Sequence, residues 1–183
     1  MKPSKIVIAL SALLLFLLSF QAESLAQDKD VRASLKATAM QRIDVETDIT
    51  IVYSRPGVKG RKIWGGLVPY NEVWRAGANE NTTFEVSKDV LIKGQKLPAG
   101  KYGLHMIPGE KEWTVIFSKN NSAWGSFSYK KGEDALRITV TTKEAPHQEW
   151  LMYGFENLAG TSATAYLWWE KLKVPFEIKA TSE

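Results

Sequence analysis

The sequence predicts an all-β fold: a single antiparallel β-sandwich or flattened barrel with a long glycine-rich loop over one end. After residue 45, short runs of β-branched and aromatic residues alternate with turn signals such as Pro-Gly, Lys-Gly and Asn-Asn, which is typical of sandwiches and barrels. No segment beyond that point has the 3.6-residue apolar period of a helix. Because no internal repeat or linker interrupts the chain, we expect one domain over residues 27–183.

The N-terminus predicts a signal peptide over residues 1–26. Lys2 and Lys5 precede an apolar run from Ile6 to Phe20, and Ser24-Leu25-Ala26 offers a small-x-small cleavage site. The run is shorter than the roughly 20 residues that a membrane-spanning helix needs, which favours cleavage over a retained anchor. We therefore expect a periplasmic or secreted protein without membrane contact after cleavage.

Composition indicates which partners to expect and which interactions stabilise the fold. The chain has no cysteine, so an exported form would depend on its hydrophobic core and not on disulfides. The formal charge is +4, and removing two lysines and one glutamate with the signal peptide leaves +3. The basic residues are scattered among acidic ones, so no nucleic-acid partner is expected.

Apolar alternation predicts the individual strands. In the first strand, Val45, Ile49, Ile51 and Tyr53 share one phase, and Arg55 falls in that phase too. One stretch, Asp28–Met40, is rich in helix-favouring Ala, Leu, Lys and Met and is expected to be helical. Turns are expected at Lys130–Ala135 and Asn157–Ser162. The predicted strands are Val45–Arg55, Thr82–Ser87, Val90–Ile92, Lys101–Ile107, Trp113–Ser118, Leu136–Thr142, Glu149–Glu156, Ala163–Trp169 and Val174–Ile178.

The familiar catalytic templates are absent. There is no Gly-x-Ser-x-Gly elbow, no phosphate-binding Gly-x-x-x-x-Gly-Lys-Ser/Thr loop and no cysteine nucleophile. The two histidines, His105 and His147, fall on different predicted elements, so neither a metal site nor a cofactor is expected. His105 alternates with Leu104 and Met106, which predicts that it faces away from the main core.

Seven tryptophans raise the question of sugar binding, because an exposed aromatic ring can stack on a pyranose. The simpler interpretation is core packing, and we expect it for Trp113, Trp150, Trp168 and Trp169. Trp64 and Trp74 differ because they lie between Pro56 and Asn81, a long segment without regular periodicity. Loops of that length are more often functional than not. These two rings either plug the end of the sandwich or line a pocket.

The segment WRAGANENTTF, from Trp74 to Phe84, holds the main candidate residues. Continuing the strand phase of Phe84 backwards places Glu80 inward, where a carboxylate requires a charged partner. Arg55 is the expected partner, with Arg75 and Arg61 as alternatives. The cluster either fastens the long loop or forms a rim pocket. The pocket would comprise Arg55, Arg61, Trp64, Trp74, Arg75, Asn79, Glu80 and His105.

Three separate motifs carry a family resemblance. "YSRPGVKGRKIWGGLVPYNEVWRAGANENTTF", "LPAGKYGLHMIPG" and "EWTVIFSKN", followed by "WGSFSY" and "LRITV", make the chain resemble the bacterial domain-of-unknown-function family 2911 from Val45 to Val140. The resemblance implies an exported protein, largely of Bacteroidetes-type bacteria, with no established activity and no known cofactor. The motif residues it carries over are Arg55, Pro56, Gly60, Arg61, Gly65, Trp74, Arg75, Gly77, Ala78, Asn79, Glu80 and Thr82.

Three functions remain open. The first is a binding module for a small polar ligand, a glycan or an anionic metabolite, held by the candidate arginines and Asn79 with stacking on Trp64 or Trp74. The second is a hydrolase that uses Glu80 as acid or base; glycoside hydrolysis would call for a second carboxylate, and the spacing selects none among Glu110, Glu112 and Asp134. The third is a structural or assembly domain. We rank binding first.

Overall fold

The computed structural model describes residues 32–181. The chain divides into two units, residues 1–33 and 34–183, and the strands lie in the second. The predicted signal peptide, residues 1–26, is outside the described residues. Between residues 32 and 181 there is no helix of the length and apolar character needed to cross a membrane.

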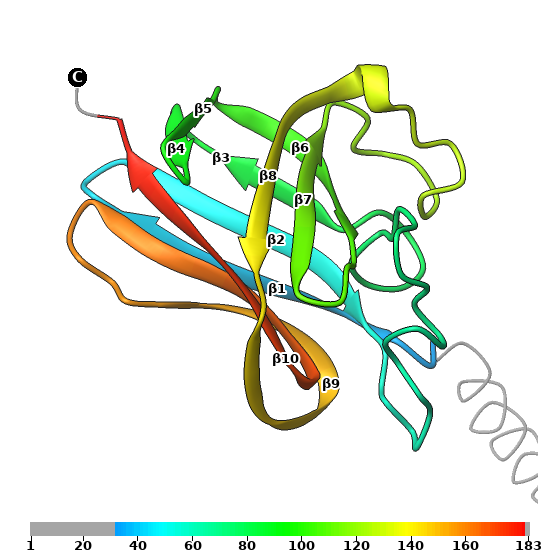
Figure 1. Cartoon of the computed structure of the whole chain (residues 1–183). Coiled ribbons are helices and arrows are strands. Elements are labelled where there is room, and N and C mark those ends of the chain that lie inside the picture. Colours follow the sequence, from blue (N-terminus) through cyan, green and yellow to red (C-terminus); the bar gives the residue numbers. More distant parts are fainter. Residues whose placement is uncertain (1–31, 182–183) are drawn as a thin grey trace, which may run out of the picture. The chain divides into compact units, whose positions relative to one another are not determined.

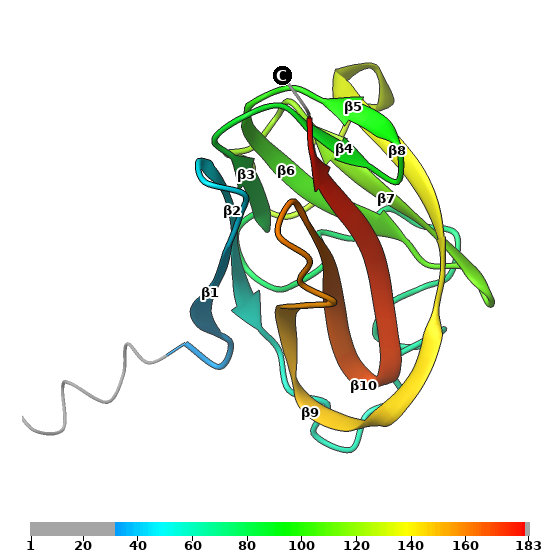
Figure 2. The same cartoon turned by 90° about the vertical axis from the view of Figure 1, so that its left-hand side faces the viewer.

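The described residues form two antiparallel sheets (Figure 1). One has six strands in the order β1-β2-β3-β6-β7-β8, and the other has four in the order β5-β4-β10-β9. In Figure 2, β9 and β10 lie side by side as a long hairpin. The strands are β1 (Leu35–Ile43), β2 (Thr47–Arg55), β3 (Thr83–Val86), β4 (Val90–Ile92), β5 (Gln95–Leu97), β6 (Gly100–Ile107), β7 (Glu112–Ser118), β8 (Asp134–Thr141), β9 (Lys143–Glu156) and β10 (Ser162–Ala180), with a short 3₁₀ turn at Lys131–Glu133.

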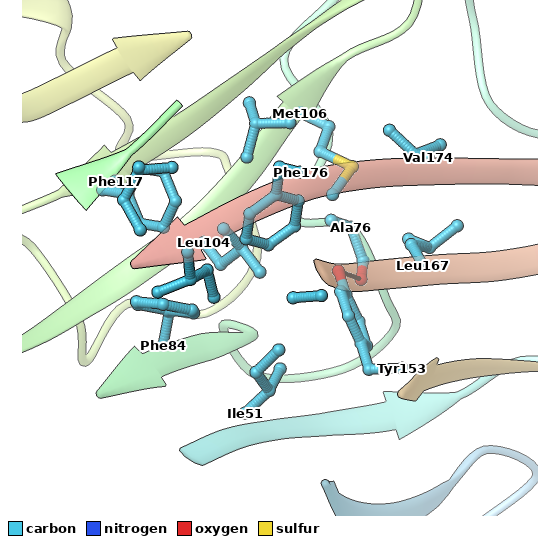
Figure 3. Packing of buried hydrophobic residues seen from close by; sticks show 14 of the residues in the cluster. Ile51, Ala76, Phe84, Leu104, Met106, Phe117, Tyr153, Leu167, Val174 and Phe176 are labelled. Atoms are coloured by element: carbon cyan, nitrogen blue, oxygen red, sulfur yellow. Dashed lines mark hydrogen bonds between the residues drawn. The ribbon is translucent and has the colours of Figure 1, made fainter. Parts of the chain in front are cut away.

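The facing surfaces of the two sheets share one hydrophobic core (Figure 3). Phe84, Leu104 and Phe117 come from the six-stranded sheet, where Phe84 and Phe117 contact Phe176 of β10, and Leu167 of β10 belongs to the same cluster. Each of these side chains is at most 1% exposed. Burial of apolar surface, at about 25 cal/mol per Å², therefore holds the sheets together. The predicted antiparallel sandwich is confirmed.

The helix expected at Asp28–Met40 is wrong over its described part, because β1 occupies Leu35–Ile43. Each residue of β1 pairs with β2, from Leu35 opposite Arg55 to Ile43 opposite Thr47. Tertiary pairing overrides the weak helix propensity of the segment. The predicted first strand also begins too early, because Val45 lies in the turn between β1 and β2 and is 86% exposed.

The two strands predicted at Ala163–Trp169 and Val174–Ile178 are one strand, β10. The buried positions are odd-numbered up to Trp169 and even-numbered from Val174 onward. Glu170 has a positive φ of 55°, and the pairing with β9 shifts register on both sides of it. Such a bulge inserts residues into one strand, so the side chains beyond it point to the opposite faces of the sheet. In the sequence, this change of phase looks like the end of one strand and the start of another.

The tryptophans predicted for the core divide into two groups. Trp113 and Trp169 are each 1% exposed, as expected. For Trp150 and Trp168 the predicted core position is wrong. Trp150 is 40% exposed. Trp168 is half-buried, and its indole N–H donates to the carbonyl of Pro146 over 2.9 Å. Trp168 lies one residue from Trp169, so the two rings point to opposite faces of β10.

Candidate functional site

Glu80 is exposed, so the prediction that it points inward is wrong. The strand that contains Phe84 begins only at Thr83, and Ala76 and Asn79 have positive φ angles of 50° and 59°. These left-handed residues bend the chain, so the period-2 phase does not extend back to Glu80. Its predicted partner Arg55 instead donates from Nε to the Leu151 carbonyl of β9 over 2.9 Å.

A polar cleft of about 350 Å³ lies beside Glu80. Its walls come from β1, β2, β3, β6 and the segments between β2 and β3 and between β7 and β8. The charged residues of this lining are Lys36, Lys101 and Glu80. The full lining is Lys36, Val52, Tyr53, Ser54, Glu80, Asn81, Thr83, Lys101, Asn121, Ser122 and Ala123. Glu80 is therefore the one predicted site residue that the structure places in this cleft.

The other arginines bind backbone carbonyls. Arg61 donates to Val58 over 3.1 Å and to Gly57 over 2.6 Å, and Arg75 donates to Asn79 over 2.5 Å. The Asn79 amide in turn donates to the Ser34 carbonyl. Desolvation lowers the pKa of the Arg75 guanidinium. These contacts fasten the segment between β2 and β3.

Trp64 and Trp74 pack against other tryptophans. The ring centroid of Trp64 lies 4.8 Å from that of Trp113 and 5.7 Å from that of Trp169, both edge-on. The Trp74 ring stacks on Trp169 at 6.0 Å with an interplanar angle of 19°. Of the two roles considered from the sequence, packing at the end of the sandwich and lining a pocket, the structure supports the first. The two rings extend the core and do not line the cleft.

His105 lies on the outer face of the six-stranded sheet, as its alternation with Leu104 and Met106 predicted. It is nevertheless only 2% exposed. Its Nδ1 lies 2.8 Å from Oγ of Ser126, in the segment that follows β7. Burial lowers the pKa of His105 from 6.5 to about 4, against an opposing attraction from Asp134. The ring is therefore neutral at physiological pH.

A second group of polar side chains lies beside His105. The carboxylate of Asp134, whose side chain is 8% exposed, accepts from the Tyr129 hydroxyl over 2.7 Å and from Arg137 Nε over 2.6 Å. Arg137 also donates to the Tyr129 hydroxyl over 2.7 Å. The Tyr129 ring centroid lies 5.4 Å from that of His105.

Sequence reasoning missed most of this cluster. Tyr129 falls in the "WGSFSY" motif, which carried the family resemblance without suggesting a role. Asp134 was considered only as a second carboxylate for Glu80. The contacts join residues of β6 and β8 with the intervening segment, and no spacing within the chain indicates such an arrangement. Among residues 32–181, no three His, Asp or Glu side chains gather closely enough to hold a metal ion.

Comparison with known proteins places the chain in a family and goes no further. No curated protein and no solved structure matches it. The model of one family matches residues 34–178, a longer stretch than the Val45–Val140 region that carries the sequence resemblance, because it adds β1, β9 and most of β10. The chain belongs to the family described as "Protein of unknown function (DUF2911)".

Proposed function

We propose that the protein binds a small polar ligand carrying negative charge in the cleft beside Glu80. The observation that carries the proposal is an open polar cleft of about 350 Å³ with two lysines and one glutamate in its lining. Its volume is at the lower end of the roughly 300–1,000 Å³ found for small-molecule sites. A ligand of a few polar groups fits this space.

The lining favours an anionic metabolite over a glycan. Lys36 and Lys101 outnumber Glu80 by one charge, and amide and hydroxyl side chains together with Val52 and Ala123 complete the walls. Lys101 also contacts Glu85 at 3.5 Å, with both side chains about half exposed, so that ion pair is weak and exchangeable. The one aromatic ring in the lining, Tyr53, is 5% exposed and offers no face on which a sugar would stack.

The two alternatives fit the site less well. Glycoside hydrolysis by the usual mechanisms needs a pair of carboxyl groups, whereas Glu80 is the single carboxylate that lines the described cleft. Fastening of the loop accounts for Arg55, Arg61 and Arg75, which bind carbonyl oxygens. It does not account for the cleft, which is lined by different residues.

Thermal unfolding of the mature protein tests the proposal. A panel of dicarboxylates and sugar phosphates is added, and a ligand at 100 times its Kd stabilises the protein by about 2.7 kcal/mol, which raises Tm by roughly 5–10 °C. We expect the Lys36→Gln/Lys101→Gln variant to lose this shift. Lys179→Gln, which removes an exposed lysine of β10, should retain it. The proposal is refuted if no compound shifts Tm at millimolar concentration, or if the shift survives in the double variant.

A further inference from the structure

We propose that Ser126 is a nucleophile with His105 as its general base, and that the protein hydrolyses carboxylic esters at this pair. The hydroxyl and the imidazole Nδ1 are already 2.8 Å apart, within the range required for proton transfer. This activity does not depend on ligand binding in the cleft.

The backbone fixes both partners. His105 is held in the middle of β6, where it pairs with Ile116 of β7. Ser126 follows Gly125, whose φ of 68° costs a glycine less than a residue with a side chain. Ser126 is partly exposed, whereas His105 is almost fully buried. The residue that carries the nucleophile is therefore partly open to solvent, while the base is shielded from water.

The Nε2 side of the His105 ring lies near the side chain of Asn81, which could orient the imidazole. When Nδ1 accepts the Ser126 proton, Nε2 carries a hydrogen. Nε2 and the Asn81 side-chain nitrogen lie 3.2 and 3.0 Å from the point where a β-carbon on Gly103 would be. Asn81 is 8% exposed, and its Oδ1 has no hydrogen-bond partner among the described residues. We assign Asn81 as the positioning residue, because its amide and Nε2 lie beside the same glycine and Oδ1 is a buried acceptor with no hydrogen bond among the described residues.

Positive charge lies next to the nucleophile. The Arg75 guanidinium packs against Gly125, with its Cζ and one terminal nitrogen 2.9 Å from the point where a β-carbon would be. Fixed positive charge near an ester carbonyl stabilises the oxyanion that forms on attack. Trp124 and Phe127, which are 56% and 85% exposed, flank Ser126 in sequence and offer apolar contact to the acyl or alcohol group.

The reaction requires no co-reactant other than water. Oγ of Ser126 forms a bond to the carbonyl carbon, and its proton passes to Nδ1 of His105. The ester C–O bond then breaks, and the alcohol leaves with the proton from Nδ1. Water, deprotonated by the same nitrogen, attacks the acyl group on Ser126, releases the carboxylic acid and restores the hydroxyl.

Burial is the main influence on the pH range of His105. It lowers the pKa of the imidazole to about 4, while Asp134 raises this pKa in part and Arg75 lowers it further. The unprotonated ring that a general base requires is therefore the form present at neutral pH. Its activity should decline only as the imidazole becomes protonated near pH 4.

Covalent labelling tests the proposal. The folded mature protein is treated with diisopropyl fluorophosphate, and the modified peptide is identified by mass spectrometry; hydrolysis of p-nitrophenyl acetate is followed in parallel. We expect the adduct on Ser126, and none there in Ser126→Ala. Because a general base contributes about 10²–10⁴-fold, His105→Gln should label at least about 100-fold more slowly. Ser128→Ala removes an exposed hydroxyl of the same segment and should label like the unmodified chain.

Absence of an adduct on Ser126 in the unmodified protein would overturn the proposal. Equal labelling of a His105→Gln variant with an unchanged Tm would also overturn it. If that variant does not fold, the pH profile of the unmodified protein decides: we expect a constant labelling rate from pH 8 to 6 and a fall below about pH 5, and a flat profile contradicts the role of His105. In Asn81→Ala the midpoint of the profile should move to lower pH, which a purely structural role would not produce.

Discussion

Substitution of Gly103 by alanine should detach the segment that covers His105. A β-carbon on Gly103 would lie 2.3 Å from the Asn120 carbonyl oxygen and 3.0 Å from the Asn81 side-chain nitrogen. Contacts below 3.0 Å essentially never occur, so the Asn120 backbone would have to move by at least about 0.7 Å. Overpacking of this kind costs about 1–3 kcal/mol, which corresponds to a fall in Tm of roughly 3–10 °C.

Gly132→Ala is the matched control for this prediction. Gly132 lies in the 3₁₀ turn that follows the same segment, and a β-carbon there meets no atom within 4 Å. Its φ is outside the left-handed range, so alanine should be neutral or stabilise by up to about 1 kcal/mol. Thermal unfolding gives the two Tm values, and hydrogen exchange should show faster exchange at residues 119–129 in Gly103→Ala alone. Equal Tm values for the two variants would refute the proposed close approach of Asn120.

Two further predictions concern buried polar groups. The pKa of His105 is about 4 in the folded state, against 6.5 in the unfolded state, so the unfolded state binds the proton first as pH falls. The free energy of unfolding should therefore decrease by about 3 kcal/mol as pH drops from 7 to below 4. Denaturant titrations at each pH should show a shallower fall in His105→Gln, and parallel curves would contradict this pKa. The buried Tyr153 hydroxyl donates to the Ala76 carbonyl over 2.8 Å, so Tyr153→Phe should cost about 0.5–1.5 kcal/mol. Thr82 donates to the same carbonyl, which should keep the loss toward the lower value, and a loss above about 3 kcal/mol would show that more than this bond is broken.

The fold could be predicted because most strands can be recognised from local apolar alternation and from the turn residues that bound them. The failures have long-range causes. β1 is a strand because β2 pairs along its whole length, and β10 appears divided because a bulge at Glu170 exchanges its faces. Neither the pairing partner nor the bulge can be deduced from a single run of residues.

The candidate site was predicted less well, and for a related reason. Strand phase correctly predicted that His105 lies on the outer face of the sheet, because β6 is regular there. The same method failed at Glu80, where residues with positive φ break the phase. Ser126 was overlooked because its partner is 21 positions away and lies on a different element. Residue types and local periodicity indicate which way a side chain points, but not which segment covers it.

The sequence offered loop fastening and a functional site as alternatives, but the hydrogen bonds of Asn81 tie the end of the loop to the segment that carries residues of both proposed sites. The backbone N–H of Asn81 donates to the Ala123 carbonyl over 3.1 Å and its side chain to the Asn120 carbonyl over 3.2 Å. These bonds hold the segment after β7 against the outer face of the sheet. That segment contributes Asn121 and Ser122 to the cleft and also carries Ser126. A variant that releases it would therefore abolish both proposed activities without identifying either. Changes at Lys36, Lys101 or Ser126 leave the two bonds of Asn81 in place, so a loss of function in those variants can be attributed to the altered group itself.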